Sequence, residues 1–427
     1  MAALLFSVRI PTLLAIFWRK RLARKANVSA DLRSIIVFRL DQLGDLVLTT
    51  PLFRELKRMY PNSRCTVVVQ PDYRSILTTN HNIDEILPLH EVQVKWLPAR
   101  ASRLVSALWF YWTRLRHRRF DLAISPRWDV DESLAIMLCV LTNAGTRVGY
   151  SERVSAAKRR INRGFDGAFD VVVPPGPVRH EVDRNLEIVE VLGGRVEDRS
   201  LDVCLTASDR RFASELLTHH DPHRILIAVG IGGRAASRRW PLSNYAELIV
   251  RLNRHRAMQP IIVCAREEDA EAAQLADMLP VRPYILSGVP LRAACAVLEL
   301  SGLFVGNDSG TVHLAAAMDC RTVVVSKHPQ GGERDHANSP VRFGPRCSHY
   351  QVVQPMEGAG DCRDSCRATQ PHCIRLVTVE MVVDAALDLL RQERRDGVSH
   401  ELFPGSIVPA ATHVTDEASL LSVARTF

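Results

Sequence analysis

Short apolar runs rich in β-branched residues alternate along the chain with longer segments whose apolar residues recur at helical spacing. The first half has three such runs, at 34–38, 65–70 and 120–125. The first run leads through a Gly-Asp pair into LVLTTPLFRELKRMY, which has the spacing of a helix. Short strands separated by helices are typical of a doubly wound, mostly parallel sheet. The first half therefore predicts an α/β domain.

The same alternation begins again after an irregular stretch rich in Pro, Gly and Arg at about 150–180. Strands are predicted within 223–233, 260–265, 302–310 and 321–326. We therefore expect an α/β protein with two Rossmann-like doubly wound domains that face each other across a cleft, with ligands at the carboxyl ends of the strands. The expected parts are an apolar and basic segment at 1–30, an N-terminal Rossmann-like domain at 31–200, a C-terminal Rossmann-like domain at 201–392 and a polar, aperiodic tail at 393–427.

The N-terminal segment is apolar over residues 2–18 and then strongly basic. A secretory signal carries its charge before the apolar run, and a membrane span needs about 20 apolar residues without the interruptions that Arg9 and Pro11 introduce here. We predict a helix that lies in the membrane interface, with Trp18 at headgroup depth. A weak span and a disordered start are the alternatives. The basic residues are Arg19, Lys20, Arg21, Arg24 and Lys25.

The charge balance points to an anionic partner. The chain has 55 Lys and Arg against 47 Asp and Glu, a net charge of +8. Nucleic acid, anionic lipid and a phosphorylated substrate would all fit this charge, but no recognised nucleic-acid-binding motif is present. Several of the ten cysteines, among them Cys65, Cys139 and Cys264, sit in apolar runs, which favours reduced thiols and the cytosol.

Polar residues follow four of the predicted strands, where a buried core would not need them. Helix N-termini favour anions, glycines let the backbone approach a ligand closely, and Arg holds phosphate oxygens bidentately. Neither a Walker loop nor a strict G-x-G-x-x-G is present, which weakens a kinase or dehydrogenase interpretation. Helix capping is the alternative role for Asp45, Asp308 and Ser309. The polar sets are Asp41 and Asp45; Gly232, Gly233, Ser237, Arg238 and Arg239; Glu267 and Glu268; and Asp308, Ser309, Gly310 and His313.

Four ordered motifs carry a family resemblance over roughly residues 34–390: RLDQLGDLVLTTPLFRELKRMYP, HEVDRNLEIVEVLG, RRWPLSNYAELI and GNDSGTVHLAAAMDCRTVVV. Together they resemble glycosyltransferase family 9, the ADP-heptose:lipopolysaccharide heptosyltransferase family, whose members have the two-domain GT-B fold. The resemblance implies an inverting, metal-independent transferase without a cofactor. It also implies an ADP-sugar donor, an anionic glycolipid acceptor such as the lipopolysaccharide core, and a place on the inner face of the bacterial inner membrane.

The resemblance also implies residue roles. Asp45, in the Gly-Asp turn, corresponds to the catalytic base, which takes a proton from the acceptor hydroxyl as that hydroxyl attacks the anomeric carbon. Arg238 corresponds to a diphosphate contact, Asp308 to a partner of sugar hydroxyls, and Glu267 to a partner of the ribose. The remaining expected site residues are Ser309, Gly310, His313, Gly232 and Gly233 on the donor side and Arg39, Asp41 and Gly44 on the acceptor side.

The chain departs from the family pattern at three of these motifs. Many relatives have D-T-G-P or D-T-G-L where this chain has DSGT, and glycines where it has CAR before Glu267. Arg238 replaces a common Lys, which keeps the charge and changes its geometry. Another donor sugar, a nucleotide-sugar epimerase and a non-catalytic nucleotide-sugar-binding protein are therefore the alternative functions.

Three further features bear on metals and membranes. The DVD sequence at 129–131 has the form of a D-x-D metal motif, for which we expect no metal role in this fold class. The segment 100–120 joins aromatic residues to six arginines, so it fits either a membrane-docking helix or a helix packed on its own sheet. The C-terminal cysteines match a zinc ligand set only loosely and leave metal binding open; they are Cys347, Cys362, Cys366 and Cys373.

Overall fold

The computed structural model describes residues 9–22, 32–92, 97–362 and 365–392. The expected tail at 393–427 and the basic residues Arg24 and Lys25 lie outside the described residues. The first sheet contains β1 Ser34–Arg39, β2 Arg64–Val69, β3 Glu85–Pro88, β4 Arg119–Ser125, β5 Asn143–Tyr150 and β6 Val171–Val173. The second contains β7 Ile225–Gly230, β8 Met258–Cys264, β9 Tyr284–Ser287, β10 Leu303–Asn307, β11 Thr322–Val325 and β12 Tyr350–Val353. We call the parts built on these sheets the first and second lobes.

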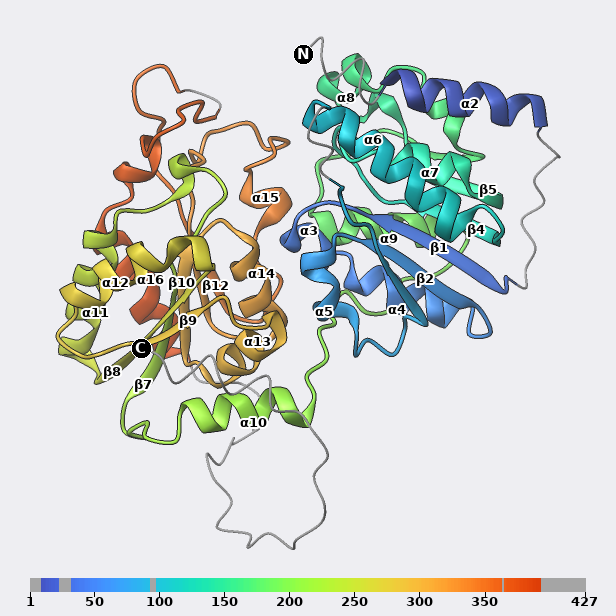
Figure 1. Ribbon diagram of the computed structural model, residues 1–427. Helices are drawn as coiled ribbons and strands as arrows, with labels where there is room; N and C mark the ends of the chain where they lie inside the picture. The colour runs from blue at the N-terminus through green and yellow to red at the C-terminus, as the bar shows by residue number, and fades with distance from the viewer. Residues whose placement is uncertain (1–8, 23–31, 93–96, 363–364, 393–427) are drawn as a thin grey trace, which may run out of the picture. The chain divides into compact units, whose positions relative to one another are not determined.

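Helices connect the strands in both lobes (Figure 1). Those of the first lobe are α2 Ile10–Leu22, α3 Leu43–Val47, α4 Thr50–Met59, α5 Arg74–Leu77, α6 Ala99–Phe110, α7 Ala135–Leu141, α8 Ala156–Ile161 and α9 Glu181–Val191. Helix α6 continues as a π-helical turn, η3 Tyr111–Leu115. Those of the second lobe are α10 Ala207–Leu216, α11 Leu242–His255, α12 Asp269–Met278, α13 Leu291–Leu300, α14 Gly310–Ala317, α15 Pro340–Phe343 and α16 Val379–Arg391.

Both sheets are parallel and share one topology. The first has the order β3-β2-β1-β4-β5-β6, and the second has the order β12-β11-β10-β7-β8-β9. Counted from its own first strand, each sheet therefore has the order 3-2-1-4-5-6 of the Rossmann fold. The strand order reverses between β1 and β4 in the first lobe and between β7 and β10 in the second. The predicted fold class, two Rossmann-like doubly wound domains, is confirmed.

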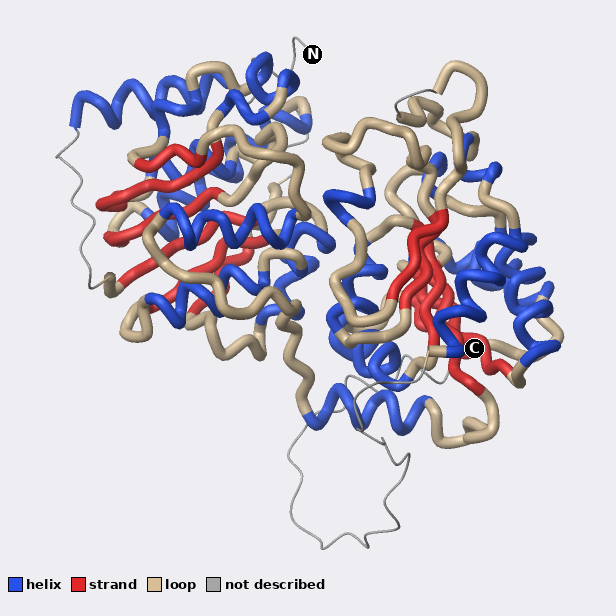
Figure 2. The backbone as a smooth tube through the Cα atoms, turned by 180° about the vertical axis from the view of Figure 1, so that it is seen from behind, coloured by secondary structure: helices blue, strands red, loops and turns tan. Residues whose placement is uncertain are grey.

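The central strands of both sheets, such as β1, β2, β7 and β10, bury side chains on both faces, which explains why they read as continuous apolar runs. In β1, Ile36 and Phe38 pack with Phe110 of α6 and Leu138 of α7. Ile35 and Val37 point to the opposite face and pack with residues of α4 and α9. The second lobe repeats the arrangement, and Figure 2 shows the strands of each sheet side by side with helices on both faces.

Helix α2 uses one of its faces inside the first lobe. Ala15 and Ile16 are buried in the same apolar cluster as α7, whereas Ile10, Leu14 and Phe17 on the other face are exposed. Among the described residues, no helix combines the length and the apolar character needed to cross a bilayer. The described part of the N-terminal segment is thus a helix that packs one apolar face on the first lobe and leaves apolar side chains exposed on the other.

Candidate functional site

The predicted site residues gather at the carboxyl ends of the strands that flank the two switch points. Arg39 ends β1, and Asp41 and Asp45 follow it. In the second lobe the glycine turn follows β7, and Asp308 follows β10. Ligands of open parallel sheets bind at such points, because the connecting helices leave the sheet in opposite directions there and open a crevice.

Asp45 lies in the first turn of α3, and a nearby backbone N–H group holds its side chain. Its carboxylate accepts a hydrogen bond from the Gln42 N–H at 3.2 Å, which satisfies one of the free donors at the start of the helix. Gln42 is the N-cap and Asp45 the third helical residue, so the simple N-cap role that the sequence left open is absent, and Asp45 instead makes this reverse bond of a capping box. The bond occupies Oδ2, and Oδ1 faces two arginines.

Two arginines surround the acidic pair at this turn. Arg39 Nη2 lies 3.5 Å and Arg127 Nη1 lies 3.6 Å from Asp45 Oδ1. The same guanidinium groups each approach Asp41 to 3.2 Å. Burial raises the pKa of the Asp41 carboxyl against the opposing effect of Arg127 and Arg39, and the neighbouring Asp45 raises it further. The turn thus keeps two carboxyls close together under a common pair of cations.

Asn307, the last residue of β10, ties the donor-side loops of the second lobe together. Its Oδ1 accepts hydrogen bonds from the Trp240 N–H at 2.9 Å and the Tyr245 hydroxyl at 3.0 Å. Its Nδ2 donates to the carbonyls of Ile231 and Gly232. Since Asn307 is fully buried, these bonds fix the glycine turn and the RRWP segment against the GNDSG turn.

Arg238 and Lys327 place positive charge beside Asp308. Arg238 Nη1 donates to the Asp308 carbonyl at 3.3 Å and lies 3.6 Å from its carboxylate, and Nη2 donates to Asn338 Oδ1. Lys327 Nζ donates to Ser237 Oγ at 2.9 Å. Burial raises the pKa of the Asp308 carboxyl, against Arg238 and Lys327. Burial lowers the pKa of the Lys327 ammonium group.

The N-terminus of α14 has no side-chain cap. Ser309 occupies the N-cap position with extended backbone, but its hydroxyl pairs with the Thr311 hydroxyl at 2.8 Å and makes no capping hydrogen bond. The capping role considered for Ser309 is therefore absent, and Asp308 makes no capping hydrogen bond to α14 among the described residues either. Uncapped N–H groups at the start of a helix favour an anion.

The two adjacent acidic residues after β8 take different positions. Glu267 is exposed, whereas Glu268 is buried and accepts hydrogen bonds from the Gly233 and Ala265 N–H groups. A Cβ atom at Gly232 would lie 2.4 Å from Glu268 Oε2, so a larger residue there would displace the Glu268 carboxylate. Glu268 therefore shapes the glycine turn, and Glu267 remains accessible to a ligand.

The acidic turn of the first lobe contacts the start of α14 in the second. Gly44 packs on the His313 ring, because a Cβ atom there would lie 2.6 Å from His313 Cδ2. Gly310 packs on Leu43 in the same way, because a Cβ atom at Gly310 would lie 3.0 Å from Leu43 Cβ. Burial lowers the pKa of His313 to about 4, and its Nδ1 has no hydrogen-bond partner among the described residues. The predicted acceptor-side and donor-side residues therefore meet.

The DVD sequence has structural partners. The Asp129 carboxylate accepts hydrogen bonds from both terminal nitrogens of Arg342, at 3.2 and 2.8 Å. Asp131 is fully buried and accepts the N–H groups of Ser133, Ala135 and Ile136 at the start of α7. An ion pair and helix capping thus account for both carboxylates.

Sequence reasoning missed several residues that complete the site. Each is a polar side chain just after a strand or in the long connection after β11, and the strand-end signal would have found three of them. They are Arg127 after β4, Asn307 at the end of β10, Lys327 after β11, and Asn338 beside Arg238.

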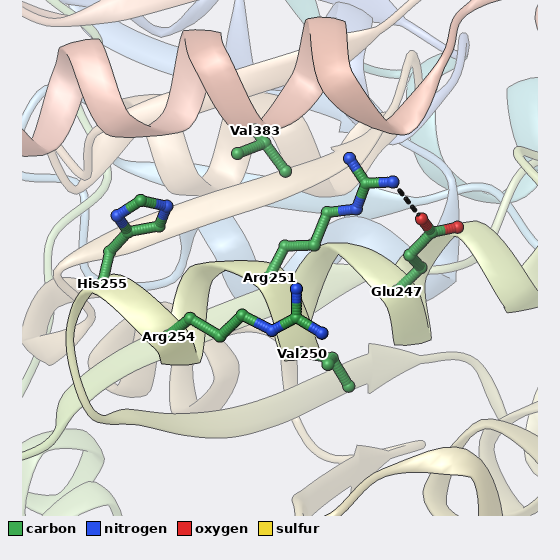
Figure 3. A pocket seen from close by; sticks show the side chains of 6 residues that line it. All are labelled: Glu247, Val250, Arg251, Arg254, His255 and Val383. Atoms are coloured by element: carbon green, nitrogen blue, oxygen red, sulfur yellow. Dashed lines mark hydrogen bonds and ion pairs between the residues drawn. The ribbon is translucent and has the colours of Figure 1, made fainter.

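A surface pocket on the second lobe lies away from these residues (Figure 3). Its lining comes from the C-terminal half of α11 and from Val383 of α16, and Arg251 there pairs with Glu247 and Glu380. A helix in a βαβ unit runs opposite to its strands, so the C-terminal end of α11 lies at the amino edge of the sheet. The pocket is therefore on the opposite edge from Arg238 and Asp308.

Comparisons with known proteins agree with this architecture. Residues 109–327 match the profile of glycosyltransferase family 9 (heptosyltransferase). Lipopolysaccharide heptosyltransferase 3 of Escherichia coli is 26% identical over 288 residues, which cover 65% of this chain and 78% of that protein.

Solved structures with the same fold cover most of the chain. The glycosyl transferase family 9 protein from Veillonella parvula superposes with a TM-score of 0.67 and 20% identity, over 86% of this chain and 99% of that one. The ADP-heptose LPS heptosyltransferase II of E. coli superposes with a TM-score of 0.60 and 18% identity, over 84% and 98%. The two Rossmann-like lobes are thus those of a GT-B glycosyltransferase, and the chain belongs to glycosyltransferase family 9, the heptosyltransferase family.

Proposed function

We propose that this protein transfers a heptose, with inversion, from ADP-heptose to the lipopolysaccharide core or a similar lipid-linked acceptor. The observation that carries the proposal is the packing of the Asp45 turn on the start of α14, through Gly44 and His313. That contact brings a carboxylate to a turn that has arginine, lysine and uncapped N–H groups. The names of the relatives, which are lipopolysaccharide and ADP-heptose transferases, support the choice of donor and acceptor.

In the proposed reaction, Asp45 acts as the general base. The acceptor hydroxyl oxygen forms a bond to the anomeric carbon while the bond from that carbon to the diphosphate oxygen breaks. ADP leaves with the electron pair, and the hydroxyl proton passes to the Asp45 carboxylate. Arg39 and Arg127 orient that carboxylate through their contacts of 3.5 and 3.6 Å to Oδ1. Asp41 and Gly44 complete the acceptor side.

The donor would bind on the second lobe. Arg238, Lys327 and the N–H groups at Ser309 and Gly310 would neutralise the diphosphate, and their interaction with it would strengthen as negative charge develops on the departing ADP. Asp308 would accept hydrogen bonds from the sugar hydroxyls, and Glu267 would accept them from the ribose hydroxyls. His313 would contact the sugar. Gly232 and Gly233 would let the backbone approach the nucleotide. With this positive charge in place, transfer is expected without an added divalent cation.

Mass spectrometry of the product tests the proposal directly. The purified full-length chain is incubated with ADP-heptose and extracted core glycolipid, and ADP release is followed in parallel. We expect the glycolipid to gain the mass of one heptose for each ADP released. If neither ADP release nor glycolipid modification occurs with any lipopolysaccharide precursor, the proposed transfer is wrong.

Removal of the Arg238 guanidinium tests the donor site. Arg238→Ala should weaken ADP binding about 10–100-fold, because charge-assisted hydrogen bonds are each worth about 1.5–3 kcal/mol. Isothermal titration calorimetry with ADP measures the change. Arg251→Ala is the matched control, since Arg251 lines the pocket of Figure 3 and should leave the affinity for ADP unchanged. An unaltered Kd in the Arg238 variant would place the diphosphate elsewhere.

We also propose that the protein is cytoplasmic and binds peripherally to the inner face of the inner membrane. On α6 and η3, the side chains of Val105, Leu108, Trp109 and Trp112 are exposed, and the Arg116 guanidinium lies 4.0 Å over the Trp112 ring. Ser106 and Ala107 on the other side of α6 are buried. Exposed aromatic residues beside arginines suit the interface of an anionic bilayer. The exposed face of α2 and the basic residues after it would add to this attachment.

Substitution of the two tryptophans tests membrane attachment. The double variant Trp109→Ser, Trp112→Ser should bind vesicles containing phosphatidylglycerol at least about tenfold more weakly, because each inserted aromatic side chain contributes about 1.5–3 kcal/mol. Vesicle co-sedimentation measures the partitioning. Met356→Ser, which removes another exposed apolar side chain, should have no such effect. Equal partitioning of the double variant and the wild type would exclude this face.

A further inference from the structure

Three cysteines and one histidine converge in the connection between β12 and α16. The Sγ atoms of Cys362, Cys366 and Cys373 and a ring nitrogen of His372 all lie within 4.8 Å of one another. Cys373 is fully buried and Cys366 nearly so, while Cys362 is half-buried. Neither the acceptor-side nor the donor-side residues take part in this cluster.

The spacing of these atoms fits a tetrahedral metal. Ligands around zinc, with Zn–S of about 2.3 Å and Zn–N of about 2.0–2.1 Å, lie roughly 3.5–3.8 Å from one another. His372 Nδ1 lies 3.5 Å from Cys373 Sγ and 3.7 Å from Cys362 Sγ. These separations leave room for an ion at the centre and are close to those that a bound ion would impose.

The structure changes the ligand set that the sequence suggested. Cys347 lies apart from the cluster, with its thiol 3.6 Å from the His349 carbonyl. His372 takes the fourth position, directly before Cys373 in the chain. The spacing is therefore C-x3-C-x5-H-C, and its first pair has the C-x2–4-C separation of other structural zinc sites.

We propose that Cys362, Cys366, His372 and Cys373 bind one structural zinc ion. Soft thiolates and an imidazole favour zinc over hard, oxygen-loving cations such as Mg²⁺ or Ca²⁺. Four protein ligands close the coordination sphere, so the site is structural and does not activate water. The proposal takes up the metal binding that the sequence left open for the C-terminal cysteines and does not depend on the proposed reaction.

The surrounding backbone is built to hold the ligands. The Ala359 N–H points at Cys373 Sγ from 3.4 Å, as backbone donors do around bound thiolates. A Cβ atom at Gly358 would lie 1.5 Å from the Cys362 carbonyl oxygen, so only glycine permits this turn. Between Val353 and the short η8 helix at Cys373–Leu376 the described residues form no regular element, and a metal would supply the order that a core supplies elsewhere.

The cluster is also linked to the donor side. The Cys366 carbonyl accepts a hydrogen bond from Lys327 Nζ at 3.3 Å, and the same ammonium group donates to Ser237 Oγ, next to Arg238. A bound metal would thus fix the position of Lys327. This consequence, unlike the metal site itself, rests on the proposed function.

Metal analysis of the full-length chain tests the site. The protein is expressed without a histidine tag, purified without chelators and examined by inductively coupled plasma mass spectrometry. We expect about one zinc per chain, a loss of at least about tenfold in Cys373→Ser, and full zinc content in Cys347→Ser, the matched control. Zinc content that is equal in the wild type and Cys373→Ser, stoichiometric iron in place of zinc, or a disulfide within the cluster would overturn the proposal.

A second measurement covers the case in which Cys373→Ser does not fold. A mercurial reagent that modifies thiols is added to the wild-type chain, and released zinc is detected with a chromogenic chelator. Thiolate-bound zinc should be released at about one ion per chain. Absence of release from the wild type would contradict the site whatever the variant does. Because no readout involves transfer, a failed metal site and a failed transferase assignment are distinguished.

Discussion

Replacement of Asp45 by Asn is expected to lower kcat about 10²–10⁴-fold, the range that a general base contributes. Asn keeps an oxygen that accepts the Gln42 N–H, so the start of α3 stays capped, but an amide cannot take a proton from the acceptor hydroxyl. The affinity for ADP-heptose should stay nearly constant, because the proposed donor contacts are on the second lobe. Steady-state kinetics and calorimetry measure the two quantities.

Asp72→Asn provides the control for the loss of one negative charge on the first lobe. Asp72 is exposed on the 3-10 helix η2 at Pro71–Tyr73, so both kcat and donor affinity should remain at the wild-type level. Full transfer by the Asp45→Asn variant, with ADP-heptose still bound, would mean that Asp45 only caps its helix.

Replacement of Arg342 by Met is expected to lower the free energy of unfolding by about 3–5 kcal/mol, the usual cost of breaking a buried ion pair. Arg342 is fully buried, and its guanidinium bonds Glu181 at 2.7 Å and Asp129 at 2.8 Å. Met fills a similar volume but leaves Asp129 without its ion-pair partner and Glu181 with Arg184 alone, at 2.8 Å. Calorimetry should show Tm lower by roughly 3–6 °C, because the entropy of unfolding of a chain this long is about 0.9 kcal/mol/K.

The pH dependence separates a lost ion pair from lost packing. Burial opposes ionisation of Asp129, but Arg342 outweighs it and lowers the pKa of that carboxyl. A lowered folded-state pKa stabilises the fold above the ordinary pKa of an aspartate, and this contribution disappears as the pH falls through the folded-state value. The difference in Tm between wild type and variant should therefore shrink below about pH 4.

Arg346→Met is the matched control for Arg342. Arg346 pairs with Asp183 at 3.4 Å while half-exposed, and such pairs contribute about 0–1 kcal/mol. The Tm of the Arg346→Met variant should therefore differ little from that of the wild type. A pH-independent loss of Tm in the Arg342 variant would assign the effect to packing alone.

The long apolar strands were predictable from the sequence. β1, β2, β4, β7, β8, β10 and β11 were all expected, because a strand covered on both faces needs an unbroken apolar run. No comparable apolar run marks β3, β5, β6, β9 and β12. Most of these are short, and β5 contains Asn143, Gly145 and Arg147, so their pairing with neighbouring strands defines them more than their own composition does.

The site was predicted in its parts. Strand-end reasoning and the family motifs selected Asp45, Arg238 and Asp308, and each lies at the carboxyl end of a strand beside a switch point. The same reasoning did not select Arg127 or Lys327. A lone cation after a strand is common, and only the folded chain puts Arg127 beside Asp45 and Lys327 near Asp308.

The sequence by itself determined the fold class, the family and the strand ends that supply polar groups, because local periodicity and short motifs depend only on residues that are close together in the chain. The tertiary structure alone decided the pairings between distant segments: Gly44 on His313, Arg342 on Asp129 and Glu181, and His372 in place of Cys347 among the cysteines. Contacts of this kind depend on the packing of whole elements, and that packing minimises the free energy of the entire chain.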